Sequence, residues 1–253
     1  MPMTINNTPA NSGILAFLYG IYAWIVFLFI LLAATIGATL IPGLDRRRGW
    51  VAAVCRLFFR LAGIPVQVSG LDNLPEGHCV VVANHASHID GVILQAFLPP
   101  RFSYVIKGEM RDIPIVHFLL RRIGARFVER FVAAESARDA RKLLQASSGG
   151  ESFAFFPEGT IMGKPGLGRF RSGAFATAIK GAIPVVPLVI SGARTILPAH
   201  VWFPRHGKLR IDLLQAIRPQ DLAYRSSREL ATQARQQMLQ VLDEPDLAVS
   251  PNT

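Results

Sequence analysis

The chain has 253 residues, enough for one large domain or two small ones with a substantial core. Its 27 lysines and arginines outnumber 17 acidic residues, and the formal net charge is +10. The sequence contains none of the common nucleic-acid-binding motifs, so we expect an anionic membrane surface, and no nucleic acid, as the partner of this basic chain. Cys55 and Cys79 lack the spacing of metal ligands and are expected to be free, buried thiols.

The N-terminal segment is expected to enter a membrane. The first 44 residues include no Asp, Glu, Lys or Arg, and residues 13–43 are apolar for longer than the roughly 20 residues that a helix needs to cross a hydrocarbon core. A secretory signal peptide is disfavoured because no basic region precedes the run and the run is too long. Glycines and prolines within it leave a single crossing and a re-entrant hairpin both open.

A basic cluster follows the apolar run at residues 46–48, and such a cluster marks the cytoplasmic side of a membrane segment. Residues 50–63 then show apolar positions at helical spacing, which predicts a helix lying in the membrane interface. We therefore expect a membrane anchor over residues 1–64 and a catalytic domain that faces the cytoplasm. The short layout suits a bacterial inner membrane.

From residue 66 onward, short β-rich runs alternate with helical patterns, which predicts an α/β fold with a mixed sheet flanked by helices. The predicted strands lie at 66–70, 78–83, 102–106, 125–130, 151–156, 183–192 and 208–213. The predicted helices lie at 87–98, 114–124, 133–148, 173–182 and 226–244, the last with Ser226 or Ser227 as its N-cap. No linker separates these elements, so residues 65–245 are treated as one domain, and residues 246–253 are expected to be a disordered tail.

The segment "NHASHID" follows the second predicted strand and allows three kinds of chemistry. His85, His88 and Asp90 could be metal ligands, although no second cluster of ligands lies downstream. Ser87 could be a nucleophile, but the nucleophile-elbow motif is absent and an N-cap is the simpler role. In the third interpretation Asp90, in the first helical turn, folds back onto one nitrogen of His85, and the other nitrogen becomes a general base. Free N–H groups at the helix start would then face a developing oxyanion.

Two further segments carry candidate binding residues. "FPEGT" places Glu158 and Thr160 at the end of an apolar strand, where α/β domains bind their ligands. The glycine-rich loop, residues 163–173, carries Arg169 and Arg171 and can hold a phosphate or a phospholipid head group, although its glycine spacing is not that of a nucleotide-binding loop.

Taken together, these segments resemble the glycerolipid acyltransferase family, in particular the 1-acyl-sn-glycerol-3-phosphate (lysophosphatidic acid) acyltransferases. Four blocks match the family in order, and a fifth segment, "VIKGEMRDIPI", matches between the first two. The four blocks are "NHASHID", "GARFVER", "FPEGT" and "IPVVPLVI". The resemblance covers residues 57–213.

The resemblance implies transfer of a fatty acyl group from acyl-CoA or acyl carrier protein to a glycerolipid hydroxyl. It implies that His85 is the general base and that Asp90 orients it. We expect the substrate to be bound by Lys107, Arg130, Glu158, Gly159, Thr160, Arg169 and Arg171. The resemblance implies no metal, acyl-enzyme or nucleotide cofactor.

One departure from the family pattern bears on the acceptor. Ile161 and Met162 follow "FPEGT", where the family commonly has Arg-Ser. The resemblance makes lysophosphatidic acid the first candidate acceptor, and because of this departure a lyso-amino-acid lipid or another lysophospholipid is the alternative. A membrane-anchored metal hydrolase and a non-enzymatic protein that binds anionic lipids are the rival classes.

Overall fold

The computed structural model describes residues 11–128, 139, 141–143, 145–147 and 149–248. It confirms the predicted α/β fold, with a seven-stranded sheet in the order β1-β7-β6-β2-β5-β3-β4. Within the described residues, β6 and β7 pair antiparallel and every other neighbouring pair is parallel. The strands are β1 (Val66–Ser69), β2 (Val80–Ala83), β3 (Phe102–Lys107), β4 (Arg126–Val128), β5 (Ser152–Phe155), β6 (Val185–Ser191) and β7 (Leu209–Leu213).

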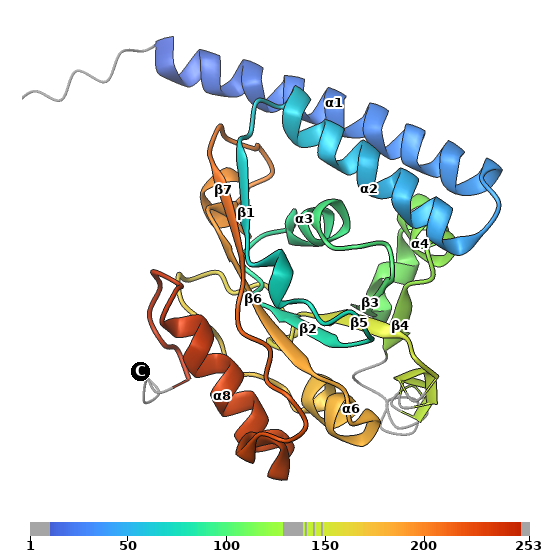
Figure 1. Ribbon diagram of the computed structural model, residues 1–253. Helices are drawn as coiled ribbons and strands as arrows, with labels where there is room; N and C mark the ends of the chain where they lie inside the picture. The colour runs from blue at the N-terminus through green and yellow to red at the C-terminus, as the bar shows by residue number, and fades with distance from the viewer. Residues whose placement is uncertain (1–10, 129–138, 140, 144, 148, 249–253) are drawn as a thin grey trace, which may run out of the picture.

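Helices cover both faces of this sheet (Figure 1). They are α1 (Asn11–Leu40), α2 (Leu44–Leu61), α3 (Asp90–Phe97), α4 (Pro114–Arg122), α6 (Gly173–Gly181), α7 (Ala193–Ile196) and α8 (Ser227–Leu239). The predicted helix at 133–148 falls largely outside the described residues.

The central strand β2 shows why two hydrophobic cores form. All four of its residues are buried, and side chains alternate between the two faces along a strand. Val81 and Ala83 belong to the core beneath α2, α3 and α4, whereas Val80 and Val82 belong to the core beneath α6 and α8. The carboxyl end of β2 is therefore fixed from both sides, and it leads directly into "NHASHID".

The apolar N-terminal run forms one continuous helix, α1, without a re-entrant break. Among the described residues it is the one helix long and apolar enough to cross a membrane, with a mean hydropathy of 2.5 over Gly13–Leu40. It lies side by side with α2 along the edge of the domain (Figure 1). In the middle of α1 the indole Nε1 of Trp24 donates to the carbonyl of Trp202 at 2.7 Å, and near its C-terminal end the carbonyl of Ala38 accepts from Arg122 at 2.9 Å. The helix is thus docked lengthwise on the domain.

Helix α2 differs from its prediction in two respects. It begins at Leu44, so the arginine cluster lies inside the helix, and Arg48 is buried, with Nε donating to the carbonyl of Ile123 at 2.8 Å. Its predicted interfacial face is also partly used inside the protein, because Val51, Val54 and Phe58 are buried while Trp50 stays exposed. Arg48 therefore attaches the α1–α2 pair to the domain. Because it is buried, it does not indicate which side of a membrane the domain faces.

The C-terminal end also differs from its prediction. Ser226 caps α8 as expected, with Oγ accepting from the N–H of Glu229 at 3.1 Å. A disordered tail was expected from residue 246 onward. The first two residues of this tail are ordered, because Asp246 and Leu247 pair with Leu167 of the glycine-rich loop. Composition suggested disorder, but backbone hydrogen bonds to that loop hold the segment.

Candidate active site

The candidate site lies at the carboxyl edge of the parallel part of the sheet. Strands β2, β3, β5 and β6 run in one direction, so the segments that follow them meet at one edge. "NHASHID" follows β2, "FPEGT" follows β5, and Lys107 ends β3. The topology therefore brings together the segments that the sequence analysis selected, as expected for an α/β fold.

His85 and Asp90 form the hydrogen bond expected of a general-base pair. Nδ1 of His85 lies 2.9 Å from Oδ2 of Asp90, and the Asp90 side chain is fully buried while that of His85 is 20% exposed. A carboxylate at this distance holds the proton on Nδ1, which leaves Nε2 with a lone pair to accept a proton. The ring of His85 also stacks on Phe156, with centroids 4.1 Å apart. The imidazole is therefore fixed in both tautomer and orientation.

The turn between β2 and α3 differs in detail from its prediction. Helix α3 begins at Asp90 with Ile89 at its N-cap position, so Ser87 is not the N-cap. The Oγ of Ser87 donates to the carbonyl of Leu197 at 2.7 Å and accepts from the N–H of Ile89 at 3.3 Å. The N–H groups of Ala86 and Ser87 donate to Oδ2 of Asp90 at 2.7 and 2.8 Å. These amides orient the carboxylate, so they are not open to an oxyanion as the sequence analysis expected.

His88 points away from the His85–Asp90 pair. Its Nε2 lies 3.1 Å from the carbonyl oxygen of Ala199, and its ring stacks on Trp202 at a centroid distance of 5.9 Å. Within the described parts of the chain, no group of three His, Cys, Asp or Glu side chains is placed to hold a metal ion. Asp90 therefore bonds to the side chain of His85 and not to that of His88.

Glu158 is a buried connector and not an exposed binding residue. Only 6% of it is exposed, Oε1 accepts from the backbone N–H of His85 at 2.7 Å, and Oε2 accepts from the N–H of Gly168 at 2.7 Å. Burial raises the pKa of the Glu158 carboxyl, and the hydrogen bonds from His85 and Gly168 oppose this rise. The carboxylate joins the histidine turn to the glycine-rich loop, so its predicted contact with substrate would have to be indirect.

Asn84 is a site residue to which the sequence analysis gave no role. Its side chain is buried, Oδ1 accepts from the N–H of Ile190 at 2.7 Å, and Nδ2 donates to the carbonyl of Ile190 at 2.9 Å. This pair of bonds extends the β2–β6 pairing by one residue and fixes the backbone just before His85. The polar Asn84 directly after an apolar strand was the signal in the sequence.

The other predicted binding residues lie at the end of β3 and in the segments that follow β5, with one exception. Lys107, Thr160, Arg169 and Arg171 are exposed, and Gly159 adopts a left-handed backbone angle (φ +78°) in the turn after β5. The N–H of Arg171 donates to the carbonyl of Pro157 at 2.8 Å, which closes the base of the glycine-rich loop next to "FPEGT". Arg130 lies outside the described residues.

The two cysteines are free and buried, as predicted. Burial raises the pKa of the Cys79 thiol to about 11 and that of the Cys55 thiol to about 12. Neither thiol is therefore ionised at neutral pH, and a thiol must be ionised to act as a nucleophile.

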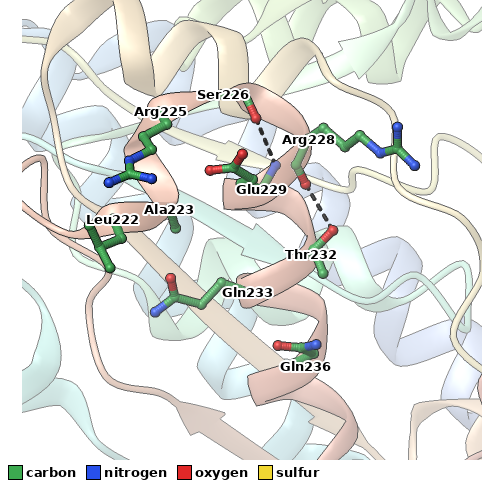
Figure 2. Close-up of a pocket in the computed structure, with 9 residues that line it drawn as sticks. All are labelled: Leu222, Ala223, Arg225, Ser226, Arg228, Glu229, Thr232, Gln233 and Gln236. Carbon is green, nitrogen blue, oxygen red and sulfur yellow. Dashed lines mark hydrogen bonds between the residues drawn. The ribbon is translucent and has the colours of Figure 1, made fainter.

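A surface hollow of about 750 Å³ among the described residues is distinct from this site. It is lined by side chains of α8 and the turn before it, including Arg225, Arg228 and Gln233 (Figure 2). The adjacent Tyr224 donates to the carbonyl of Ile217, which pairs with Val185 at the amino end of β6. Because β6 runs parallel to β2, this hollow lies at the sheet edge opposite to His85.

Comparisons with known proteins place the chain in a family. The family model described as "Acyltransferase" matches residues 65–191, from β1 to the end of β6. A 1-acyl-sn-glycerol-3-phosphate acyltransferase of Saccharomyces cerevisiae is 28% identical over 83% of this chain and 71% of its own length. A lyso-ornithine lipid O-acyltransferase of Pseudomonas aeruginosa is 27% identical over 88% of this chain and 87% of its own length.

The fold also matches a solved structure. The crystal structure of PlsC, a 1-acyl-sn-glycerophosphate (LPA) acyltransferase from Thermotoga maritima, superposes with a TM-score of 0.77 and covers 95% of this chain and 99% of that chain, at 22% identity. The matched family region contains His85, Asp90 and the "FPEGT" turn, and half of the chain lies within it. This chain belongs to the acyltransferase family.

Proposed function

We propose that the protein transfers a fatty acyl group from acyl-CoA or acyl carrier protein to lysophosphatidic acid, giving phosphatidic acid at a membrane surface. The observation that carries the proposal is the hydrogen bond between Nδ1 of His85 and Asp90 in a member of the acyltransferase family. The name of the yeast relative supports this choice of acceptor.

In the proposed mechanism, Nε2 of His85 takes the proton of the acceptor hydroxyl as the oxygen attacks the thioester carbonyl. Asp90 stabilises the imidazolium that forms. The C–S bond then breaks, and the leaving thiolate takes the proton from Nε2, which returns the neutral imidazole. Positioned general bases contribute about 10² to 10⁴ to the rate.

Cationic side chains at the same sheet edge would hold the acceptor head group. Lys107, Arg169 and Arg171 are exposed near the ends of β3 and β5, and Arg130 is proposed to act with them on the strength of the family pattern. Guanidinium groups bind phosphate oxygens in a bidentate manner, which suits a monoester phosphate.

We propose that α1 lies along the membrane surface rather than crossing the bilayer. Leu28 and Phe29 are among its exposed apolar side chains. Further exposed apolar side chains lie on α2, α4 and the 202–203 turn, including Trp50, Phe118 and Trp202. Trp202 stacks on His88, which joins this apolar surface to the turn that carries the proposed base. A lipid acceptor would then reach His85 from the membrane, with the domain on the cytoplasmic side.

A lyso-amino-acid lipid is the second candidate acceptor. The lyso-ornithine lipid O-acyltransferase matches over 88% of this chain, and Ile161 and Met162 replace the basic residue that the family pattern has after "FPEGT". A site with fewer guanidinium groups suits a head group that lacks a phosphate monoester.

The test is acyl transfer by the purified full chain in mixed micelles. Labelled lysophosphatidic acid, lysophosphatidylethanolamine and lyso-ornithine lipid are each offered with acyl-CoA or acyl carrier protein, and kcat/KM is measured. We expect lysophosphatidic acid to be preferred. Preference for lyso-ornithine lipid would favour the second candidate, and no transfer to any acceptor would refute an acyltransferase of this class.

A further inference from the structure

Residues 244–247, here called the C-terminal strap, run beside the glycine-rich loop. The N–H of Leu167 donates to the carbonyl of Pro245 at 2.9 Å, and the N–H of Leu247 donates to the carbonyl of Leu167 at 3.1 Å. Leu167 is fully buried between them. The strap lies outside the residues matched by the family model, so the family pattern assigns it no role.

Glu244 is the polar centre of the strap. Its Oε2 accepts from the N–H of Gly166 at 2.6 Å, and its two oxygens each lie 3.1 Å from a nitrogen of Arg194 in α7. The same guanidinium donates to the carbonyl of Met162 at 2.5 Å. The Arg194–Glu244 pair therefore holds the loop on both sides of residues 163–165.

Arg235 of α8 adds a second attachment. Its guanidinium donates to the carbonyls of Leu167 and Gly168 and to the carboxylate of Asp246, and its side chain is only 11% exposed. It also lies over the ring of Phe170, 5.3 Å from the centroid. One largely buried cation thus joins the strap to Leu167, Gly168 and Phe170 of the loop.

The loop in turn is one hydrogen bond from the connector of the active site. The N–H of Gly168 donates to Oε2 of Glu158, whose Oε1 accepts from the N–H of His85. A Cβ at position 168 would lie 2.6 Å from Oε2 of Glu158, so only glycine allows this approach. Between the strap and His85 there are therefore only residues 167–168 and the Glu158 carboxylate.

We propose that the C-terminal strap, through Glu244, is a positioning element for His85. The inference rests on the proposed function and deepens it, because it names the residues that hold the general base in position. The strap fixes the amide of Gly168, Gly168 fixes Glu158, and Glu158 fixes the backbone of His85. Displacement of a catalytic group by about 1 Å can lower a rate by about 10²-fold, so a loosened loop is expected to act on turnover.

The test compares Glu244→Gln with Asp243→Asn, which makes the same change of charge at the exposed neighbouring residue. We expect kcat to fall about tenfold in Glu244→Gln, with a smaller change in KM, and to stay within about twofold in the control. Hydrogen exchange at the Gly168 amide should speed up only in Glu244→Gln. An unchanged kcat together with a lowered Tm would overturn the proposal, because it would show a purely structural role.

A double variant tests the route. If Glu244 acts through Glu158, the loss of kcat in Glu244→Gln combined with Glu158→Gln should be smaller than the product of the two single losses. Independent, multiplicative losses would contradict the proposed route.

Hydrogen exchange of the wild-type protein keeps the proposal testable if Glu244→Gln does not fold. The amides of Leu167, Gly168 and Leu247 should open as one unit, with the same dependence on denaturant. Opening of Leu247 and Leu167 without Gly168 would overturn the proposal. Hydrogen exchange does not depend on turnover. Inactivity with every lysolipid would therefore refute the proposed function without deciding whether the strap positions the backbone of His85.

Discussion

The carboxylate of Glu158 accepts a hydrogen bond from the backbone N–H of His85 at 2.7 Å, although the two residues are 73 positions apart. The other oxygen of the same carboxylate holds Gly168. This relationship gives a physical reason for the joint presence of "NHASHID" and "FPEGT", since the second segment fixes the backbone of the first.

Replacing Glu158 by glutamine is expected to lower kcat strongly. A glutamine side chain has one acceptor oxygen, so the N–H of either His85 or Gly168 loses its partner inside the protein. We expect a loss on the order of 10²-fold in kcat, measured in steady-state kinetics with saturating acceptor. Glu76→Gln, at an exposed position, is the control. Full activity in Glu158→Gln would show that the connector is dispensable.

The same variant should change how stability depends on pH. Because burial raises the pKa of Glu158 above 4.5, the folded protein keeps this proton to higher pH than the unfolded chain does. The contribution of this group to stability is therefore fully present below pH 4.5 and is lost as pH rises through the folded-state pKa. The free energy of unfolding, measured with urea between pH 4 and 8, should therefore fall with rising pH in the wild type relative to Glu158→Gln. A difference that grows with pH would contradict the direction.

Asp90→Asn is expected to abolish most turnover while leaving the fold intact. An amide in place of the carboxylate no longer fixes the proton on Nδ1 of His85 and does not stabilise the imidazolium, a loss on the order of 10³ to 10⁴ in kcat. His88→Ala is the control, because His88 contacts Ala199 and Trp202 instead. Equal losses in both variants would argue against the assignment of roles.

Asn84→Ala should destabilise the protein more than Asn73→Ala. Removing the Asn84 amide leaves both the N–H and the carbonyl of Ile190 without their buried partner, which costs about 2 kcal/mol or more. Asn73 makes one half-buried bond to the carbonyl of Leu213, so about 1 kcal/mol is expected there. Chemical unfolding gives both free energies, and equal values would mean that Asn84 does not clamp β6.

The turn carrying His85 and Asp90 could be predicted because both partners lie within six consecutive residues. The contact of Glu158 with His85 could not, since it depends on the register of β2 against β5, which spacing along the chain does not reveal. Hydropathy predicted a membrane segment at α1 but carried no information on its docking against Trp202. The strap was missed because backbone hydrogen bonds, which composition does not show, order residues 246–247.

The orientation of α1 can be measured by quenching of tryptophan fluorescence. Trp24 lies in the middle of α1, so a crossing helix would place it near the bilayer centre, whereas a helix along the surface places it at shallow depth. A variant that keeps Trp24, with Trp50 and Trp202 changed to Phe, is bound to vesicles of brominated phosphatidylcholine and phosphatidylglycerol. Bromines near the glycerol region should quench it most. Strongest quenching by bromines near the chain ends would show that α1 crosses the bilayer.

The central claim is that His85 is the general base of an acyl transfer to a lysolipid. The most direct measurement is the rate at which purified wild-type protein and His85→Ala convert labelled lysophosphatidic acid to phosphatidic acid with acyl-CoA or acyl carrier protein. We predict turnover by the wild type and a loss on the order of 10² to 10⁴ in kcat in His85→Ala, with both proteins equally folded by circular dichroism. Wild-type rates in His85→Ala would contradict the account.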